Sequence, residues 1–255
     1  MNLRAFDFSV VDNVGRIRLN QPDNGNPFNT EFCKEFNALS VECSENPEVR
    51  AVLIDAAGPN FSFGGDLKEF IEEPEQLPAR FKRLTADLHM GVARLARNDE
   101  PVVVAAHNLV VGGAVALVAG GDFVYATPKT RFYAAFSAIG VCGDTGTSFF
   151  LPRRVGSRRA TEFLMLNETW SADKAAEYGL INGVVEEEQL QVHCMDLARR
   201  LAQGPTEVYG RMRRLLLSSF SQTLENQLLI EAASMVECAR SEEALEAMRR
   251  LVNKS

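Results

Sequence analysis

The most apolar pattern in the chain lies at its centre, in residues 101–127, and predicts a strand, a tight glycine turn, a short buried helix and a second strand. Residues 102–106 form a β-branched run without polar alternation, which is typical of a strand covered on both faces. Residues 113–119 are apolar on every side, so a helix formed by them must be buried. Gly112 and Gly113 stand where this helix would begin.

Upstream of this block the pattern changes from alternation to helical spacing. Residues 5–11 and 15–19 alternate apolar and polar positions on either side of a two-residue turn, which predicts a β-hairpin. Asn29 then stands at the N-cap position of a segment whose apolar residues fall on one helical face. Residues 49–56 predict the next strand, and this strand leads into another glycine turn, Gly64-Gly65, which is the first of the two along the chain.

Downstream of the block, helical spacing dominates from residue 157 onward, with one short strand expected at residues 181–185. The chain beyond residue 188 predicts four amphipathic helices, whose apolar faces exceed what short helices can bury alone. We therefore divide the chain into a core of residues 1–200, expected to carry binding and catalysis, and a helical oligomerisation region of residues 201–255.

Composition and charge narrow the class of protein. The chain has 255 residues, 46% of them hydrophobic, and a formal net charge of -7, which predicts a folded protein and disfavours a nucleic-acid or anionic-membrane surface. Its five cysteines show no CxxC spacing, which argues against a zinc site or a disulfide framework. No apolar run is long enough to span a membrane and no leader precedes the first strand, so we expect a cytoplasmic protein without a metal.

Both glycine turns follow a strand and precede a helix, and this arrangement suggests anion chemistry. The first amides of a helix have no partner inside it and lie at the positive end of its dipole. Because glycine has no Cβ, a ligand atom could approach this backbone closely. Gly112-Gly113 is therefore a candidate site for an anion or a developing oxyanion, with a tightly packed turn as the structural alternative. The sequence alone leaves open whether the two turns converge.

Five segments in this order resemble the enoyl-CoA hydratase/isomerase (crotonase) superfamily over nearly the whole chain. They are LNQPDNGNPFN, FSFGGDLKEF, PVVVAAHNLVVGGAVALVAGGDF, GDTGTSFFLPRRVG and SADKAAEYGLINGVV. The resemblance implies an α/β fold, a crotonase-like spiral of ββα units with a C-terminal helical trimerisation region, assembled as a homotrimer or a dimer of trimers. It also implies an acyl-CoA substrate, in which coenzyme A is part of the substrate and not a separate cofactor.

The resemblance further implies that the backbone N–H groups of Gly65 and Gly113 hold the enolate oxygen of a thioester. Prealigned amides in a dry site commonly contribute about 3 kcal/mol each to transition-state stabilisation. Family hydratases activate water with two glutamates, but the matching positions here are Ala116 and Phe136, which transfer no proton. One carboxylate remains where several family isomerases carry an aspartate, namely Asp144.

A single carboxylate can remove and return one proton, so we expect Asp144 to shift a carbon–carbon double bond in an enoyl-CoA. Burial beside Phe136 and Ile139 is expected to raise its pKa. The GDTGTS segment also resembles 4-chlorobenzoyl-CoA dehalogenase, which implies Asp144 as a nucleophile and His89 as the group that activates water. Hydration by a non-standard site and a non-catalytic CoA-ester-binding homologue are further alternatives. The structural alternatives are a turn or helix-cap role for Asp144 and a partly exposed packing role for His89.

The resemblance places further residues along the substrate channel. Lys68 follows the first glycine turn and is our first candidate for a CoA phosphate, with Arg80–Arg83 as the second. Helix capping explains Asp66 as well as ligand binding does, and Ser62 has no positioned base that would make it a nucleophile. The remaining expected substrate contacts are Ser62, Phe63, Gly64, Asp66, Gly112 and Phe136.

Overall fold

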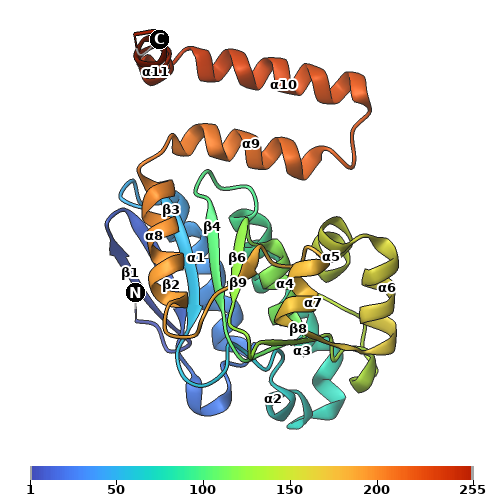
Figure 1. Ribbon diagram of the computed structural model, residues 1–255. Coiled ribbons are helices and arrows are strands. Elements are labelled where there is room, and N and C mark those ends of the chain that lie inside the picture. Colours follow the sequence, from blue (N-terminus) through green and yellow to red (C-terminus); the bar gives the residue numbers. More distant parts are fainter. Residues whose placement is uncertain (1, 254–255) are drawn as a thin grey trace.

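The computed structural model describes residues 2–253, which form two β-sheets, the helices that cover them and a helical tail (Figure 1). The strands are β1 (Phe6–Val11), β2 (Val14–Leu19), β3 (Ala51–Ala56), β4 (Val102–Ala106), β5 (Leu109–Val111), β6 (Phe123–Ala126), β7 (Arg131–Tyr133), β8 (Thr169–Ser171) and β9 (Gly183–Val184). The helices of the body are α1 (Thr30–Glu45), α2 (Leu67–Ile71), α3 (Leu77–Leu95), α4 (Gly113–Gly120), α5 (Thr147–Val155), α6 (Ser157–Leu166), α7 (Ala172–Glu177) and α8 (Leu190–Ala202). The tail consists of α9 (Thr206–Ser218), α10 (Leu224–Ala239) and α11 (Glu242–Val252).

In its central part the chain alternates between two β-sheets. The large sheet has the order β1-β2-β3-β4-β6-β9, in which β1 and β2 pair antiparallel and the other neighbours pair parallel. The small sheet has the order β5-β7-β8. The chain passes from β4 through β5 to α4 and from β6 through β7 toward α5, so successive units place one strand in each sheet before a helix. The α/β prediction and its repeating strand–strand–helix units are therefore confirmed.

The predicted N-terminal elements form for the expected local reasons. β1 and β2 are a hairpin, and Asp12 and Asn13 in its turn have φ values of 53° and 62°, as this tight turn requires. α1 begins where Asn29 accepts a hydrogen bond of 2.9 Å from the amide of Phe32. The apolar face of α1 is buried, as predicted: Phe32, Phe36, Leu39 and Cys43.

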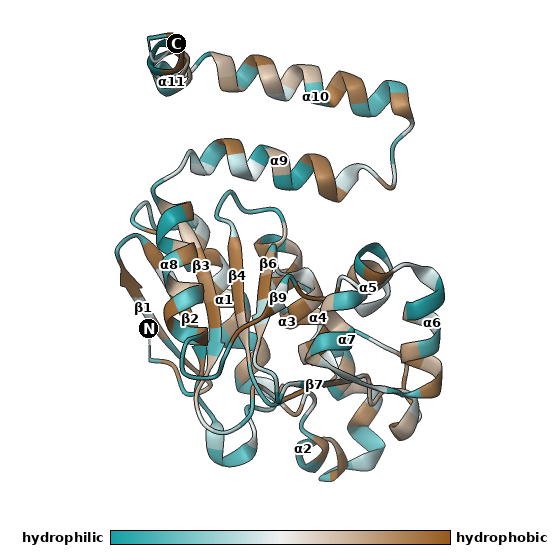
Figure 2. Cartoon of the chain, in the orientation of Figure 1, coloured by the Kyte–Doolittle hydropathy of each residue, from teal (hydrophilic) through white to brown (hydrophobic). Residues whose placement is uncertain are grey.

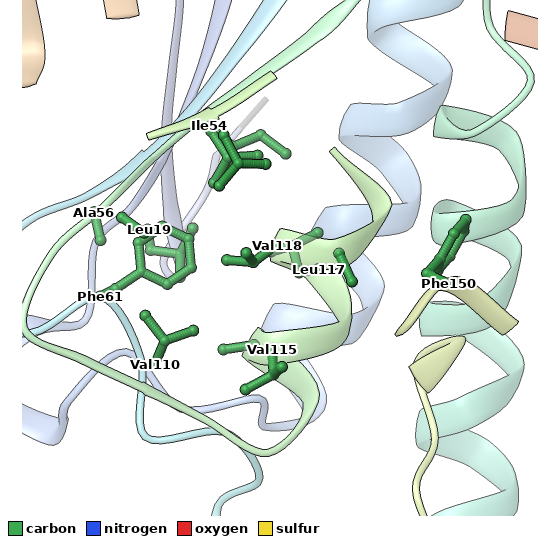
Figure 3. Packing of buried hydrophobic residues seen from close by; sticks show 14 of the residues in the cluster. Leu19, Ile54, Ala56, Phe61, Val110, Val115, Leu117, Val118 and Phe150 are labelled. Carbon is green, nitrogen blue, oxygen red and sulfur yellow. The ribbon is translucent and has the colours of Figure 1, made fainter. Parts of the chain in front are cut away.

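Both faces of the large sheet are covered, which explains its continuous apolar strands. Leu53 and Val103 point to the face packed by α8, whereas Ile54 and Val104 belong to the main core on the opposite face. α4 lies within that main core and is buried at every residue from Gly113 to Ala119. Figure 3 shows side chains of α4 pointing toward the sheet residues, with Phe150 on the opposite side of the helix.

The central block contains one strand more than its pattern predicts. Residues Leu109–Val111, expected to belong to the glycine turn, form β5 and pair parallel with β7. The expected strand at residues 181–185 is shorter, since only Gly183 and Val184 pair with β6. A three-residue strand cannot show a periodicity of its own, because its pairing depends on a partner distant in sequence.

The helical tail stands away from the sheets (Figure 1) and carries apolar surface that the chain itself does not bury. The predicted boundary near residue 200 falls in the last turn of α8, which packs on the large sheet. α9 is tied to the body by Arg213, which forms an ion pair of 2.7 Å with Asp122. No residue of α10 is buried within the described chain, yet Figure 2 shows hydrophobic turns along it. None of the helices in residues 2–253 is long and apolar enough to cross a membrane.

Asn26 ties the first loop to the loop before the first glycine turn, and its removal should destabilise the protein. Its side-chain amide donates to the carbonyl oxygens of Ala57, Asn60 and Phe61, and its Oδ1 accepts from the amide of Gln21. Since Asn26→Ala leaves several buried groups without partners, we expect the free energy of unfolding to fall by about 2–3 kcal/mol.

Urea denaturation of Asn26→Ala and wild type measures this loss. The matched control is Asn24→Ala in the same loop, where the side chain is exposed and should change stability by less than about 0.5 kcal/mol. Equal stability of the two variants would contradict the structural role of Asn26.

Candidate active site

Strand register brings three strand-to-helix turns side by side. Ser62 forms a parallel bridge with Val110, and Val110 in turn pairs parallel with Phe132. Parallel neighbours run in one direction, so the segments that follow these residues leave at one common edge. These segments are the two glycine turns and residues 134–136, and they therefore lie next to one another.

The two glycine turns touch through their backbones. Gly64 and Gly112 have φ values of 77° and 57°, which favour glycine. A Cβ on Gly64 would lie 2.6 Å from the carbonyl oxygen of Val111 and 3.4 Å from Cα of Gly112. The convergence that the sequence left open is thus present in the structure.

In each turn the second glycine has a backbone amide without a hydrogen-bond acceptor in the described chain. The amide of Gly64 donates to Oγ of Ser62 (3.0 Å) and that of Gly112 donates to the carbonyl oxygen of Tyr133 (2.9 Å). In contrast, the amides of Gly65 and Gly113 donate no hydrogen bond to any residue of the described chain, 2–253. Two neighbouring donors without acceptors are what an oxyanion site requires.

The other residues predicted around the first glycine turn have separate roles. Ser62 is fully buried, and its hydroxyl donates to the carbonyl oxygen of Asn26 (2.7 Å), so it holds the turn and does not face a ligand. Asp66 caps α2 by accepting 3.1 Å bonds from two amides, which is the structural alternative considered for it. Phe63 is 45% exposed, and Lys68 is exposed and forms no ion pair with a described residue.

Asp144 does not serve as a helix cap. α5 begins after Gly146 without a side-chain cap, and Oδ1 of Asp144 accepts a 3.0 Å hydrogen bond from the hydroxyl of Thr145. Burial raises the pKa of Asp144 above its usual range, in the predicted direction. The predicted lining is wrong in part, because Ile139 is 45% exposed and points away from the core.

Thr145 connects the parts of the site, and sequence analysis missed it. Its hydroxyl contacts Asp144, its amide donates to Nε2 of His89 (3.2 Å), and Oγ1 lies 2.9 Å from where a Cβ on Gly113 would stand. The residue is buried and has a φ of 56°, a strained conformation for a β-branched side chain. No local sequence signal distinguishes such a residue, since its backbone conformation is imposed by these contacts.

His89 is exposed at the edge of the site. Because Nε2 accepts the Thr145 amide, the neutral ring carries its proton on Nδ1. The packing role considered for His89 is thus partly realised, as the ring supports the turn that carries Asp144. It faces Asp144 closely enough for its charge to lower the pKa of that carboxyl, against the larger effect of burial.

A cavity of about 380 Å³ opens beside Asp144, and we call it the Asp144 cavity. It brings together the predicted residues Asp144 and His89, and Asp144 is the only carboxylate among its described lining residues. Gly65 and Gly113 do not line it, but Thr145 does and contacts Gly113. The lining residues that sequence analysis missed belong to α3 and the turn after it, to the segment around Asp144, to α5 and to α9: Val92, Ala93, Ala96, Arg97, Gly143, Thr145, Gly146, Ser148, Phe149, Phe150 and Leu217.

Packing residues occupy the two positions that the family resemblance assigns to the hydratase glutamates. Ala116 on α4 is 1% exposed and Phe136 is 8% exposed. Phe136 lies against Gly143, where a Cβ would approach its ring to 3.6 Å, so it supports the Asp144 segment from behind and does not line the Asp144 cavity. Within residues 2–253 no group of three or more His, Cys, Asp or Glu residues could hold a metal ion.

Comparison with known proteins defines the family. The model of the enoyl-CoA hydratase/isomerase family matches residues 10–255. A 4-chlorobenzoyl coenzyme A dehalogenase from Arthrobacter sp. is 32% identical over 217 residues, 85% of this chain and 79% of that protein. A trans-2-decenoyl-[acyl-carrier-protein] isomerase from Streptococcus mutans is 31% identical over 223 residues, 86% of this chain and 84% of that protein. The structure of an enoyl-CoA hydratase from Mycobacterium smegmatis superimposes with a TM-score of 0.92 at 25% identity, covering 98% of this chain and 97% of that one.

The chain belongs to the enoyl-CoA hydratase/isomerase family and has the crotonase fold, and this membership makes it an enzyme that processes an acyl thioester. The resemblance seen in the five segments is therefore confirmed. The relatives include a dehalogenase, an isomerase and a hydratase, so family membership does not choose among these reactions.

The raised pKa of Asp144 means that its ionised form lowers the stability of the folded protein. A carboxyl whose pKa is higher in the folded than in the unfolded protein costs stability once it is ionised, and the loss grows as the pH rises through the folded-state pKa. Asp144→Asn removes this cost. We therefore expect the variant to be more stable than wild type at pH 8, with an advantage that shrinks as the pH is lowered through the raised pKa toward the ordinary pKa of an aspartate. Urea denaturation across this range measures it, and a variant less stable than wild type at pH 8 would contradict the prediction.

Proposed function

We propose that the protein shifts a carbon–carbon double bond of an enoyl-CoA, interconverting 3-enoyl-CoA and 2-enoyl-CoA. The observation that carries this proposal is the single carboxylate of the Asp144 cavity. A 1,3-proton transfer needs one base that removes a proton from the α-carbon and returns it to the γ-carbon. Hydration by the family's usual pair needs two carboxylates, and Ala116 and Phe136 occupy those positions.

Proton removal next to a thioester carbonyl places negative charge on its oxygen. The free amides of Gly65 and Gly113 can donate to that oxygen without reorganisation, since no protein acceptor in the described chain competes for them. Thr145 contacts both Gly113 and Asp144, which supports a base held next to the enolate. Its hydroxyl donates to Asp144 and so stabilises the ionised form that acts as the base.

For the coenzyme, Lys68 is the cation we assign to a CoA phosphate. It is exposed just after the first glycine turn and forms no ion pair with a described residue. Arg80, a member of the second candidate cluster, instead pairs with Glu73 at 3.3 Å and lies 4.0 Å from Glu72. Its charge is already compensated, which favours Lys68 over Arg80.

The isomerase proposal is tested with purified protein and a 3-enoyl-CoA. We expect formation of the 2-enoyl-CoA, with kcat/KM falling about 10²–10⁴-fold in Asp144→Ala because the base is lost. In wild type, kcat/KM should rise with pH through the raised pKa of Asp144, since the carboxylate is the active form. Wild-type turnover in Asp144→Ala would refute the assigned role.

A second candidate is hydrolytic dehalogenation of an aryl-CoA, with Asp144 as the nucleophile. The observation in its favour is that His89 and Asp144 line one cavity and are joined through Thr145. The 32% identical dehalogenase from Arthrobacter adds to this. Against it, Nε2 of His89 already accepts the Thr145 amide, so its lone pair is not free to activate water.

Chloride release from 4-chlorobenzoyl-CoA separates the two candidates. The isomerase proposal predicts no release above background at high enzyme concentration, because His89 presents a donor and not a base. Release that disappears in His89→Gln would instead establish the hydrolytic reaction.

We also propose that the tail assembles the protein into a trimer or a dimer of trimers. α10 and α11 have no buried residue, while Leu224, Leu229 and Met235 are each at least 70% exposed. Burying such a side chain gains about 1.5–3 kcal/mol, and exposed apolar surface of this kind marks an interface.

Size exclusion with light scattering tests this assembly. We expect a mass of three or six times 28.1 kDa at micromolar concentration. Leu229→Glu should lower the mass because it places a charge in the buried interface, and a monomer mass that persists on concentration of wild type would refute the assembly.

A further inference from the structure

The Asp144 cavity extends along one face of α3 and its C-terminal end. Its α3-side lining recurs with helical spacing from His89 through Val92, Ala93 and Ala96 to Arg97. The two end residues are separated by about 12 Å along the helix axis, at 1.5 Å per residue. Asp144 lies at the His89 end, because the amide of Thr145 donates to His89. The cavity therefore leads away from the reacting carbon atoms toward Arg97.

The middle of the cavity is apolar, with Val92 and Ala93 on one side and Phe150 and Leu217 on the other. A second cavity of about 200 Å³ shares Ala96, Phe150 and Leu217 with the first, so the two adjoin at these residues. Its charged lining residues are Arg153, Arg154, Arg213 and Asp122, and we call it the arginine cavity.

Most of the positive charge at this distal end has no acidic partner among the described residues. Arg213 is paired with Asp122, but Arg97, Arg153 and Arg154 form no ion pair with any residue in 2–253. Arg153 stacks on the ring of Phe149 at 3.5 Å, and its Nε is buried without a hydrogen-bond acceptor. An unpaired buried donor of this kind is costly unless a ligand completes it. Local positive charge is notable in a chain whose net charge is -7.

We propose that the site selects acyl thioesters whose acyl group has an apolar middle and a terminal carboxylate, held by Arg153 and Arg97. This inference rests on the proposed function, which places the thioester carbonyl at the glycine turns and the reacting carbons at Asp144. The far end of the acyl group then reaches the arginine cavity. Guanidinium groups bind carboxylates through charge-assisted hydrogen bonds, and the unpaired Nε of Arg153 supplies one donor.

The experiment compares two 3-enoyl-CoA substrates of equal chain length that end in a carboxylate or in a methyl group. We expect wild type to prefer the carboxylate substrate by at least tenfold in kcat/KM, and Arg153→Met and Arg97→Met to reduce this ratio toward one. Arg153→Lys keeps the charge and should retain part of the preference. The matched control is Arg158→Met on α6, an exposed arginine outside both cavities, which should leave the ratio unchanged.

The outcomes separate this inference from the proposed function. Equal turnover of both substrates by wild type overturns the inference and leaves the isomerase intact. If neither substrate reacts, the isomerase proposal fails, and calorimetry with the two saturated acyl-CoA analogues decides the inference by their affinities. Calorimetry with free CoA tests whether the arginines hold a CoA phosphate instead. A loss of CoA affinity in Arg153→Met would show that they do, and it would also overturn the inference.

Discussion

The active-site geometry depends on a backbone-to-backbone contact between two turns that lie far apart in the sequence. Gly64 approaches Val111 and Gly112 so closely that a single Cβ would occupy the space of a carbonyl oxygen. This contact is possible because Ser62 and Val110 pair in register, and it brings the free amides of Gly65 and Gly113 into neighbouring turns. The buried side chains of Ser62 and Asn26 stabilise this contact. Both donate hydrogen bonds to backbone carbonyl oxygens of the neighbouring loops.

The chemistry of the site follows from how few ionisable groups remain near these amides. Ala116 and Phe136, the positions that the family resemblance assigns to the two hydratase glutamates, are buried packing residues, and one aspartate lies beside a largely apolar cavity. Burial disfavours the charge on Asp144, while the Thr145 hydroxyl partly restores it. In the proposed isomerisation, a raised pKa makes the Asp144 carboxylate a stronger base for removing a proton from carbon. The strained backbone of Thr145 is maintained by the same contacts that position Asp144.

Positive charge and exposed apolar side chains are each concentrated in one part of the molecule. The chain is acidic as a whole, but arginines without acidic partners among the described residues gather beyond the apolar middle of the Asp144 cavity. The tail carries apolar residues that find no partner in their own chain. The first imbalance is the basis of the proposed carboxylate specificity, and the second is the basis of the proposed assembly.

Local sequence patterns determined the elements whose causes are local. The hairpin with its turn, the N-cap of α1 by Asn29, the strand β4 covered on both faces and the wholly apolar α4 all form as predicted, because turn chemistry and hydrophobic period act over a few residues. The five segments also identified the family and pointed to Gly65, Gly113 and Asp144. Tertiary structure decided the rest: that residues 109–111 pair as β5, that the two turns touch, that Ile139 is exposed and that Thr145 and Arg97 line the Asp144 cavity. These features depend on register between strands and helices distant along the chain, and that register is set by packing of the whole core and not by any short stretch of sequence.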